Sequence, residues 1–146
     1  FLSFRGDDTR YSFVSHLYAA LVRNKIKTYK DDENLKRGHE ISDAILQAIH
    51  ESKLYVVIFS ENYASSTWCL DELVHILQCK ERNKQIVIPV FYHVDPAHVR
   101  KQLGNFGRAF LEVEKRFNDK IEKVKAWRAA LSTAANLSGW DSSVKR

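Results

Sequence analysis

Two short apolar segments constrain the fold more than any other feature of the sequence. They are Leu54–Phe59 (LYVVIF) and Ile86–Tyr92 (IVIPVFY), and neither contains a charged residue. Short runs rich in β-branched and aromatic residues, without polar alternation, are typical of strands buried on both faces. Phe1–Phe4 and Ile26–Tyr29 are two weaker candidates for strands. The chain is therefore expected to be an α/β domain built on a parallel sheet.

Helical patterns separate the expected strands. Apolar residues recur at four-residue spacing in two segments: Phe13, Leu17 and Leu21, then Ile41, Ile45 and Ile49. Two further helices are expected, over Trp68–Lys80 and Lys120–Leu137. Strands and helices that alternate in this way form right-handed crossovers and a parallel sheet. Ligands bind such sheets beyond the carboxyl ends of the strands, which here are followed by residues 5–10, 31–40, 60–68 and 93–105.

Length and cysteine content place limits on the class of protein. With 146 residues the chain has the common size of one domain, which we assign to residues 1–146. No apolar stretch approaches the roughly 20 residues that span a bilayer, and the first ten residues lack the features of a signal peptide. Cys69 and Cys79 fall in one expected helix, roughly 15 Å apart, so they cannot form a disulfide. Free thiols fit a reducing compartment, and we expect the cytoplasm, or also the nucleus.

The net charge of +5 raises the question of nucleic-acid binding. The basic residues of segments 80–84 and 115–125 are interleaved with five acidic residues: Glu81, Glu112, Glu114, Asp119 and Glu122. Mixed signs favour a solvated surface over a stripe that follows phosphates. Neither nucleic acid nor a membrane is an expected partner.

The sequence lacks the motifs of several functions that are common in proteins with parallel sheets. The turn after the first expected strand is Arg5-Gly6-Asp7-Asp8, which is no GxGxxG fingerprint, and neither GxxxxGK[ST] nor GxSxG occurs. Cysteine and histidine do not follow zinc spacing. We expect no metal and no bound cofactor.

Trp68 and Glu72 are four residues apart and share one face of an expected helix. An aromatic ring beside a carboxylate suits a cationic ring joined to a sugar, and Arg5 and Arg37 suit a pyrophosphate. Nicotinamide leaves NAD+ as a neutral molecule, so one carboxylate that stabilises the cationic transition state is sufficient. Taken alone, the residues favour a plainer interpretation, in which Trp68 is a core residue, Glu72 a solvated helix residue and the arginines surface residues. His75, four residues after Asp71, favours a surface ion pair.

Several segments together resemble the plant-type TIR domain (Toll/interleukin receptor homology) of intracellular immune receptors. They occur in the family's order: FLSFRGDDTR (1–10), Ser15-His16, TYKDDENLKRG (28–38), SSTWCLDEL (65–73), IPVFYHVDPAHVRKQLGNFGRAF (88–110) and LSGW (137–140). The resemblance implies a flavodoxin-like sheet of five parallel strands with helices on both faces. It also implies self-association, pairing with other TIR domains, and cleavage of NAD+ as a substrate to nicotinamide and ADP-ribose-type signalling products.

The resemblance also assigns roles to individual residues. Glu72 matches the catalytic glutamate, and Trp68 the aromatic residue of the nucleotide pocket. Arg5 and Gly6 match the loop after the first strand, and four further residues match the loop that closes over the substrate: Asp32, Lys36, Arg37 and Gly38. Two pairing surfaces are implied, with the residues Ser15, His16 and Gly107. A non-catalytic scaffold that pairs through the same surfaces remains the alternative.

Overall fold

The computed structural model describes residues 1–9, 13–30 and 41–142. Its strands are β1 (Leu2–Ser3), β2 (Leu54–Phe59), β3 (Ile86–Phe91) and β4 (Trp140–Asp141). Its helices are α1 (Gly6–Thr9), α2 (Phe13–Arg23), α3 (Asp43–Glu51), α4 (Thr67–Asn83), α5 (Pro96–Lys101), α6 (Gly104–Arg116) and α7 (Ile121–Ala135), with a 3-10 turn η1 (Tyr63–Ser65). The expected alternation of strands and helices is confirmed.

The sheet is parallel, and its strands lie in the order β1-β2-β3-β4. The segment expected to be a strand at Ile26–Tyr29 lies beside β1 and, among the described residues, joins it through one parallel bridge, Leu2 to Lys30. The Leu2 N–H donates to the Tyr29 carbonyl at 3.0 Å. Counting this segment as the second in sequence, the spatial order is 2-1-3-4-5, which is the flavodoxin-like order. The α/β fold with a parallel sheet is therefore confirmed, with the second segment reduced to a bridge.

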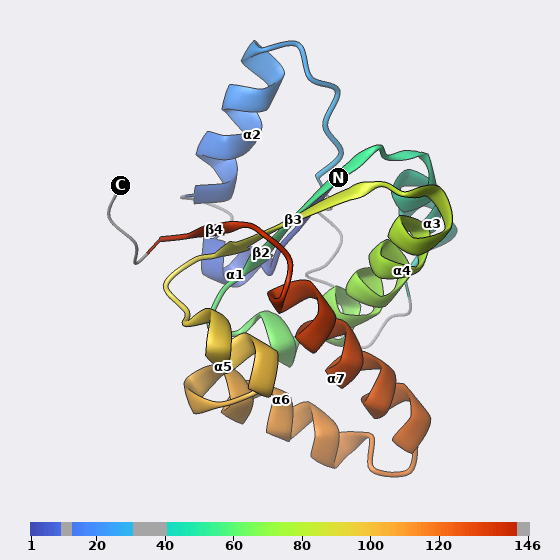
Figure 1. Cartoon of the computed structure of the whole chain (residues 1–146), viewed down its shortest axis with the longest axis vertical. Coiled ribbons are helices and arrows are strands. Elements are labelled where there is room, and N and C mark those ends of the chain that lie inside the picture. Colours follow the sequence, from blue (N-terminus) through green and yellow to red (C-terminus); the bar gives the residue numbers. More distant parts are fainter. Residues whose placement is uncertain (10–12, 31–40, 143–146) are drawn as a thin grey trace.

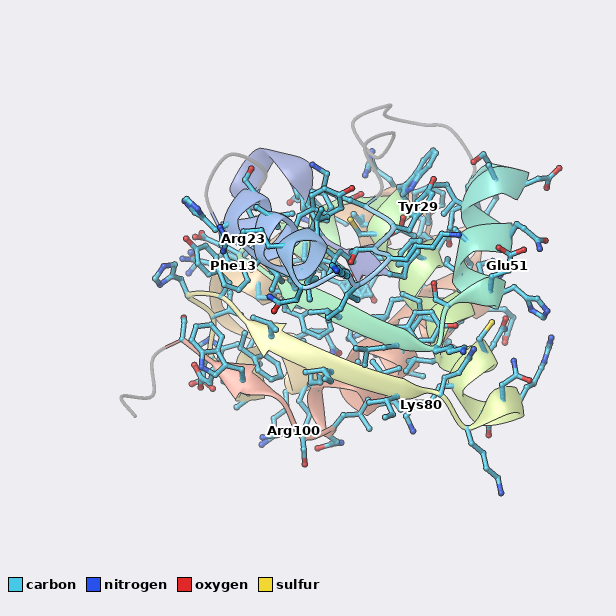
Figure 2. The ribbon with its side chains drawn as sticks, turned by 90° about the horizontal axis from the view of Figure 1, so that it is seen from above. Phe13, Arg23, Tyr29, Glu51, Lys80 and Arg100 are labelled. Atoms are coloured by element: carbon cyan, nitrogen blue, oxygen red, sulfur yellow. The ribbon has the colours of Figure 1, made fainter. Side chains whose placement is uncertain are left out.

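Helices cover the two faces of the sheet unequally (Figure 1). The larger core cluster joins one face to α3, α4, α6 and α7. On the other face, α2 packs Val14 against Leu2, Phe4, Ile58 and Val90. Figure 2 shows α2 nearly end-on, with its first and last residues, Phe13 and Arg23, labelled. Leu54 and Ile86, at the amino ends of β2 and β3, are 40% and 61% exposed.

Capping residues define where the helices begin. The Ser66 side chain accepts a hydrogen bond from the Cys69 N–H at 3.1 Å, which starts α4 within the expected Ser65–Thr67 run. Asp95 accepts from the Ala97 N–H at 2.8 Å, and Pro96 occupies the first turn of α5. Both helix starts lie just after the carboxyl ends of strands, so short caps fix the helices that border this edge of the sheet.

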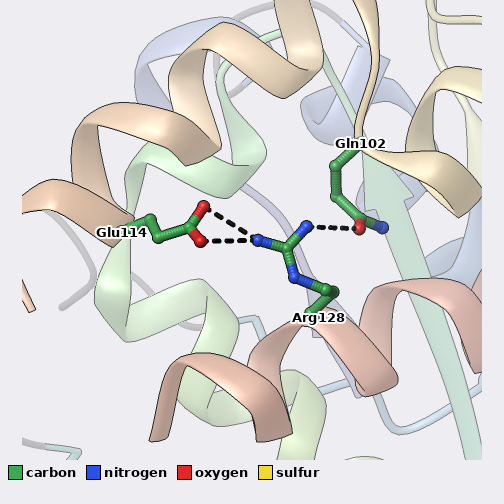
Figure 3. A network of polar contacts seen from close by, with 3 residues as sticks. All are labelled: Gln102, Glu114 and Arg128. Carbon is green, nitrogen blue, oxygen red and sulfur yellow. Dashed lines mark hydrogen bonds and ion pairs between the residues drawn. The ribbon is translucent and has the colours of Figure 1, made fainter. Parts of the chain in front are cut away.

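An ion-pair network connects the last three helices (Figure 3). The Arg128 guanidinium on α7 donates to both Glu114 carboxylate oxygens on α6 at 2.8 Å. It also donates to Gln102 Oε1, just after α5, at 3.1 Å. Helix α6 was not predicted as a helix, although Phe106, Phe110 and Val113 follow helical spacing and are buried. Acidic and basic residues pair repeatedly on α6 and α7, which agrees with the mixed-sign surface inferred from the sequence.

Within residues 1–9, 13–30 and 41–142, every helix is too short or too polar to cross a bilayer.

Candidate functional site around Glu72

Glu72 is a carboxylate with no exposed surface. Its Oε1 accepts a hydrogen bond from the Ser3 hydroxyl at 2.9 Å. Its Oε2 accepts one from the Trp68 indole N–H at 3.1 Å. Burying an ionisable carboxyl group is costly unless hydrogen bonds compensate for the lost water, and these two donors supply such compensation.

The donors come from separate parts of the chain. Ser3 is the last residue of β1, and Glu72 lies on α4, one helical turn after Trp68. Ser3 is in register with Val57 of β2 and is bonded to Glu72, so Glu72 lies beside the carboxyl end of β1. This is the edge at which parallel sheets bind ligands. Glu72 lies on α4, the helix that follows the expected segment 60–68, and its catalytic role stays a prediction.

A second hydroxyl continues the chain of polar contacts. The Tyr63 hydroxyl of η1 lies 2.8 Å from Ser3 Oγ and 3.1 Å from the Cys69 carbonyl oxygen. Burial raises the pKa of Tyr63 well above its usual value, and the neighbouring Cys69 and Glu72 raise it further. Tyr63 is therefore protonated at neutral pH. We use the name Glu72 cluster for four side chains: Ser3, Tyr63, Trp68 and Glu72.

Comparison with known proteins identifies the domain. The sequence model of the TIR domain matches residues 1–146. The chain belongs to the TIR domain family. Two similar curated proteins are disease resistance protein RPV1 of Vitis rotundifolia, 57% identical over 140 residues, and TMV resistance protein N of Nicotiana glutinosa, 54% identical over 139 residues.

The matched region is a small part of those relatives. It includes 96% and 95% of this chain, but only 10% of RPV1 and 12% of protein N. The TIR domains of the activated Roq1 resistosome, which directly recognises the pathogen effector XopQ, superimpose on this TIR domain with a TM-score of 0.87. They share 53% identity over 96% of this chain and 84% of that chain.

The structure brings together the two residues that the sequence analysis paired. Trp68 and Glu72 share a face of α4 and are joined by a hydrogen bond. The alternative that Glu72 is solvated is wrong, because the side chain is fully buried. Trp68 is only 5% exposed and belongs to the larger core cluster, as that alternative proposed. The indole therefore joins the core to the carboxylate in the TIR domain.

The other expected nucleotide-binding residues divide into two groups. Arg5 and Gly6 directly follow β1, within three residues of Ser3; Arg5 is half-buried and Gly6 is buried. The remaining four lie outside the described residues: Asp32, Lys36, Arg37 and Gly38. The binding roles of all six stay predictions. Among the described residues, no group of three or more His, Cys, Asp or Glu side chains is arranged to hold a metal ion.

The expected pairing residues lie on different faces of the sheet. Ser15 and His16 are on α2, where His16 is exposed and Ser15 half-buried. Gly107 is on α6, whose Phe106 packs edge-on against Phe59 in the larger core cluster. The two sets would therefore form two separate surfaces. Their roles in pairing stay predictions.

Gly107 has an internal reason to be glycine. A Cβ atom placed there would lie 2.3 Å from the Gln102 carbonyl oxygen. This distance is far shorter than a van der Waals contact, and the opposing atom is backbone rather than a flexible side chain. Any side chain at position 107 would therefore displace α6 from the end of α5.

Asp71 bonds to residues that the sequence analysis did not connect with it. Its carboxylate accepts from the Trp127 indole at 2.8 Å and lies 3.7 Å from the Lys123 ammonium. The expected ion pair with His75 is wrong, because among the described residues Asp71 forms its ion pair with Lys123. Asp71 holds α7 against α4.

Sequence reasoning missed Ser3 and Tyr63. A polar residue between Leu2 and Phe4 in a buried strand was a usable signal for Ser3, since such a hydroxyl needs a partner. For Tyr63 the sequence offered little, because a tyrosine in a loop is common and its partner is 60 residues away.

Proposed function

We propose that this TIR domain is an immune signalling domain that self-associates and, when assembled, hydrolyses NAD+ to nicotinamide and ADP-ribose-type products. The observation that carries the proposal is the buried carboxylate of Glu72 at the carboxyl edge of the sheet, held by the Trp68 indole. The similarity to the TIR domains of plant resistance proteins and of an activated resistosome supports the immune role. We assign the domain to the cytoplasm or nucleus.

The proposed reaction breaks the bond between the ribose C1′ and the nicotinamide nitrogen. Both bonding electrons go to the nitrogen, which converts the cationic pyridinium to neutral nicotinamide. The ribose carbon becomes cationic in the transition state, and the Glu72 carboxylate stabilises that charge. A water oxygen then bonds to C1′ and releases a proton, giving ADP-ribose. No acid has to protonate the leaving group.

Complete burial of Glu72 bears on when the reaction occurs. A carboxylate without exposed surface does not contact a ribose in the arrangement described here. Substrate must therefore displace the groups that cover it, and a free-energy cost opposes this opening. Contacts between copies would lower that cost if they favour the open arrangement. This reasoning links catalysis to assembly and predicts low activity for a dilute domain.

Nicotinamide release from NAD+ at high protein concentration tests the proposal. We expect Glu72→Ala to reduce turnover about 10²- to 10³-fold, because one stabilising charge at the reacting centre is lost. Glu72→Gln keeps the size and polarity but not the charge, and we expect a similar loss. Glu114→Gln is the matched control, since Glu114 also accepts two hydrogen bonds but lies at the α6–α7 network.

The outcomes separate the enzyme from the scaffold. Wild-type nicotinamide release in Glu72→Ala would exclude Glu72 as the catalytic group. No release from any version at any concentration, together with intact self-association, would favour the non-catalytic scaffold. Circular dichroism and thermal unfolding of each variant establish that the fold is retained.

Self-association is tested at α2. His16 is exposed, and we expect His16→Ala to weaken association measured by sedimentation while leaving thermal unfolding unchanged. His50→Ala on α3 is a matched control, because His50 is also an exposed histidine on a helix. Equal effects of the two substitutions would remove His16 from the pairing surface.

A further inference from the structure

Three hydroxyl and carboxyl groups form a short buried chain. Ser3, Tyr63 and Glu72 each have no exposed surface. The contacts are 2.8 Å from Tyr63 to Ser3 and 2.9 Å from Ser3 to Glu72. They join η1, β1 and α4 within one cluster, so a change at one group is transmitted to the next without passing through solvent.

The direction of the hydrogen bonds follows from the number of protons. An ionised carboxylate has no proton, so the single Ser3 hydroxyl proton is donated to Glu72. Ser3 can then only accept in its contact with Tyr63, and the Tyr63 hydroxyl is the donor. The Cys69 carbonyl, at 3.1 Å, is a second and longer acceptor for the same proton. The Ser3 proton therefore points to Glu72, and the Tyr63 proton lies between Ser3 Oγ and the Cys69 carbonyl oxygen.

We propose that the Tyr63–Ser3 hydroxyl pair is a positioning device that fixes the orientation and the ionised state of Glu72. Each donor polarises the next, so Tyr63 strengthens the Ser3 hydrogen bond to the carboxylate. Trp68 holds the other oxygen, so the carboxylate is fixed at both ends. The inference rests on the proposed function for its effect on turnover, but its effect on the carboxylate can be measured without turnover.

Two substitutions remove one hydroxyl each. Ser3→Ala deletes the donor to Glu72, and Tyr63→Phe deletes the donor to Ser3 while keeping the ring that packs edge-on against Phe59 at 5.0 Å. The matched controls are Ser132→Ala, which loses a hydroxyl bonded to the Arg100 carbonyl at 2.8 Å, and Tyr55→Phe, which loses another buried tyrosine hydroxyl. The controls remove similar groups outside the cluster.

Turnover kinetics give the first measurement. We expect Ser3→Ala to lower kcat about tenfold to a hundredfold, since a misplaced catalytic group costs that much. Tyr63→Phe should lower it about fivefold, the effect of one ordinary hydrogen bond. KM should change less than about twofold. On the acidic side of the pH profile, kcat should fall at a higher pH in both variants, because the hydrogen bond that stabilises the ionised Glu72 carboxylate is lost or weakened. Ser3→Thr, which keeps the hydroxyl, should restore the wild-type profile.

The Trp68 indole provides the second measurement, which needs no substrate. Its N–H proton resonance reports the position of Glu72 Oε2, and Trp68→Phe assigns the signal. We expect this resonance to shift, and its exchange with solvent to accelerate, in Ser3→Ala. The Trp127 indole, bonded to Asp71, should stay unchanged as the internal reference. A merely structural role would lower stability without moving the pH profile or the Trp68 signal selectively.

Failure of this inference is distinguishable from failure of the proposed function. An unchanged Trp68 signal and pH profile in both hydroxyl variants would overturn the positioning role, even if Glu72→Ala abolishes turnover. No nicotinamide release from any version would overturn the proposed enzymatic function, and wild-type release in Glu72→Ala would overturn only the catalytic role of Glu72. In either case the Trp68 signal alone would decide whether Ser3 positions the carboxylate.

Discussion

Glu72 and Glu114 each accept two described side-chain hydrogen bonds, but in opposite surroundings. Glu72 has no exposed surface, and the described donors to it are a hydroxyl and an indole. The Glu114 side chain is 38% exposed, and its donor is the guanidinium of Arg128. Glu72 lies on α4 and bonds to the last residue of β1. Glu114 lies on α6 and bonds to Arg128 of α7 (Figure 3).

The difference separates two uses of the same functional group. The hydroxyl and indole donors at Glu72 are neutral and orient the carboxylate through hydrogen bonds. A guanidinium neutralises its partner, and water screens the remaining interaction. We therefore expect changes around Glu72 to affect both stability and turnover, and changes around Glu114 to affect only stability, by small amounts.

The largest predicted effect comes from removing an indole donor. Trp68→Phe keeps a ring in the core but leaves Glu72 Oε2 without the indole N–H, which we expect to reduce the free energy of unfolding by about 1–3 kcal/mol. Trp127→Phe removes the corresponding bond to Asp71, whose side chain is 23% exposed. Water can replace that donor, so the expected loss is smaller. Equal losses in urea titrations would contradict the comparison.

The second prediction concerns alkaline pH. Because burial raises the pKa of Tyr63, the folded domain keeps this proton above pH 10 while the unfolded chain loses it. The contribution of the Tyr63 proton to the free energy of unfolding is fully present below pH 10. It declines as the pH rises above 10, by up to about 1.4 kcal/mol per pH unit. Tyr63→Phe should have a flatter decline in unfolding free energy between pH 10 and 11. Identical slopes for the two proteins would show that Tyr63 does not titrate in this way.

The smallest predicted effect lies at the periphery. Arg128→Gln should reduce the free energy of unfolding by about 1 kcal/mol at low ionic strength, because its partner is accessible to water. The loss should shrink in 1 M NaCl, where the wild-type ion pair is already screened. Turnover per folded molecule should not change. A loss several times larger, or one that salt leaves unaltered, would place this network with the buried cluster.

The sequence predicted the elements whose residues carry their own signal. Strand β2 and helix α4 follow from a continuous apolar run and from helical spacing, and these patterns reflect burial directly. Segment 26–29 has β-forming residues, but Ile26 is 49% exposed and Tyr29 is 37% exposed. These side chains bury too little surface to stabilise a full strand. Helix α6 was detectable from the spacing of its buried residues.

The candidate site was only partly predictable. Trp68 and Glu72 are neighbours on a helix, so their pairing follows from local geometry. The Ser3–Glu72 and Ser3–Tyr63 bonds join residues 69 and 60 positions apart. Such contacts depend on how β1, η1 and α4 pack, and hydroxyl-bearing residues are too common for their positions in sequence to reveal this.

The close approach of Gly107 to the Gln102 carbonyl affects how genetic data on this domain would be interpreted. A screen for loss of signalling would recover substitutions at position 107, and they would resemble lesions in a pairing surface. A loss of even 1–2 kcal/mol lowers the steady-state amount of a protein in cells several-fold. Such alleles would act through abundance, and immunoblots at matched expression would distinguish them from alleles that prevent assembly. Temperature-sensitive phenotypes at this position would have the same origin.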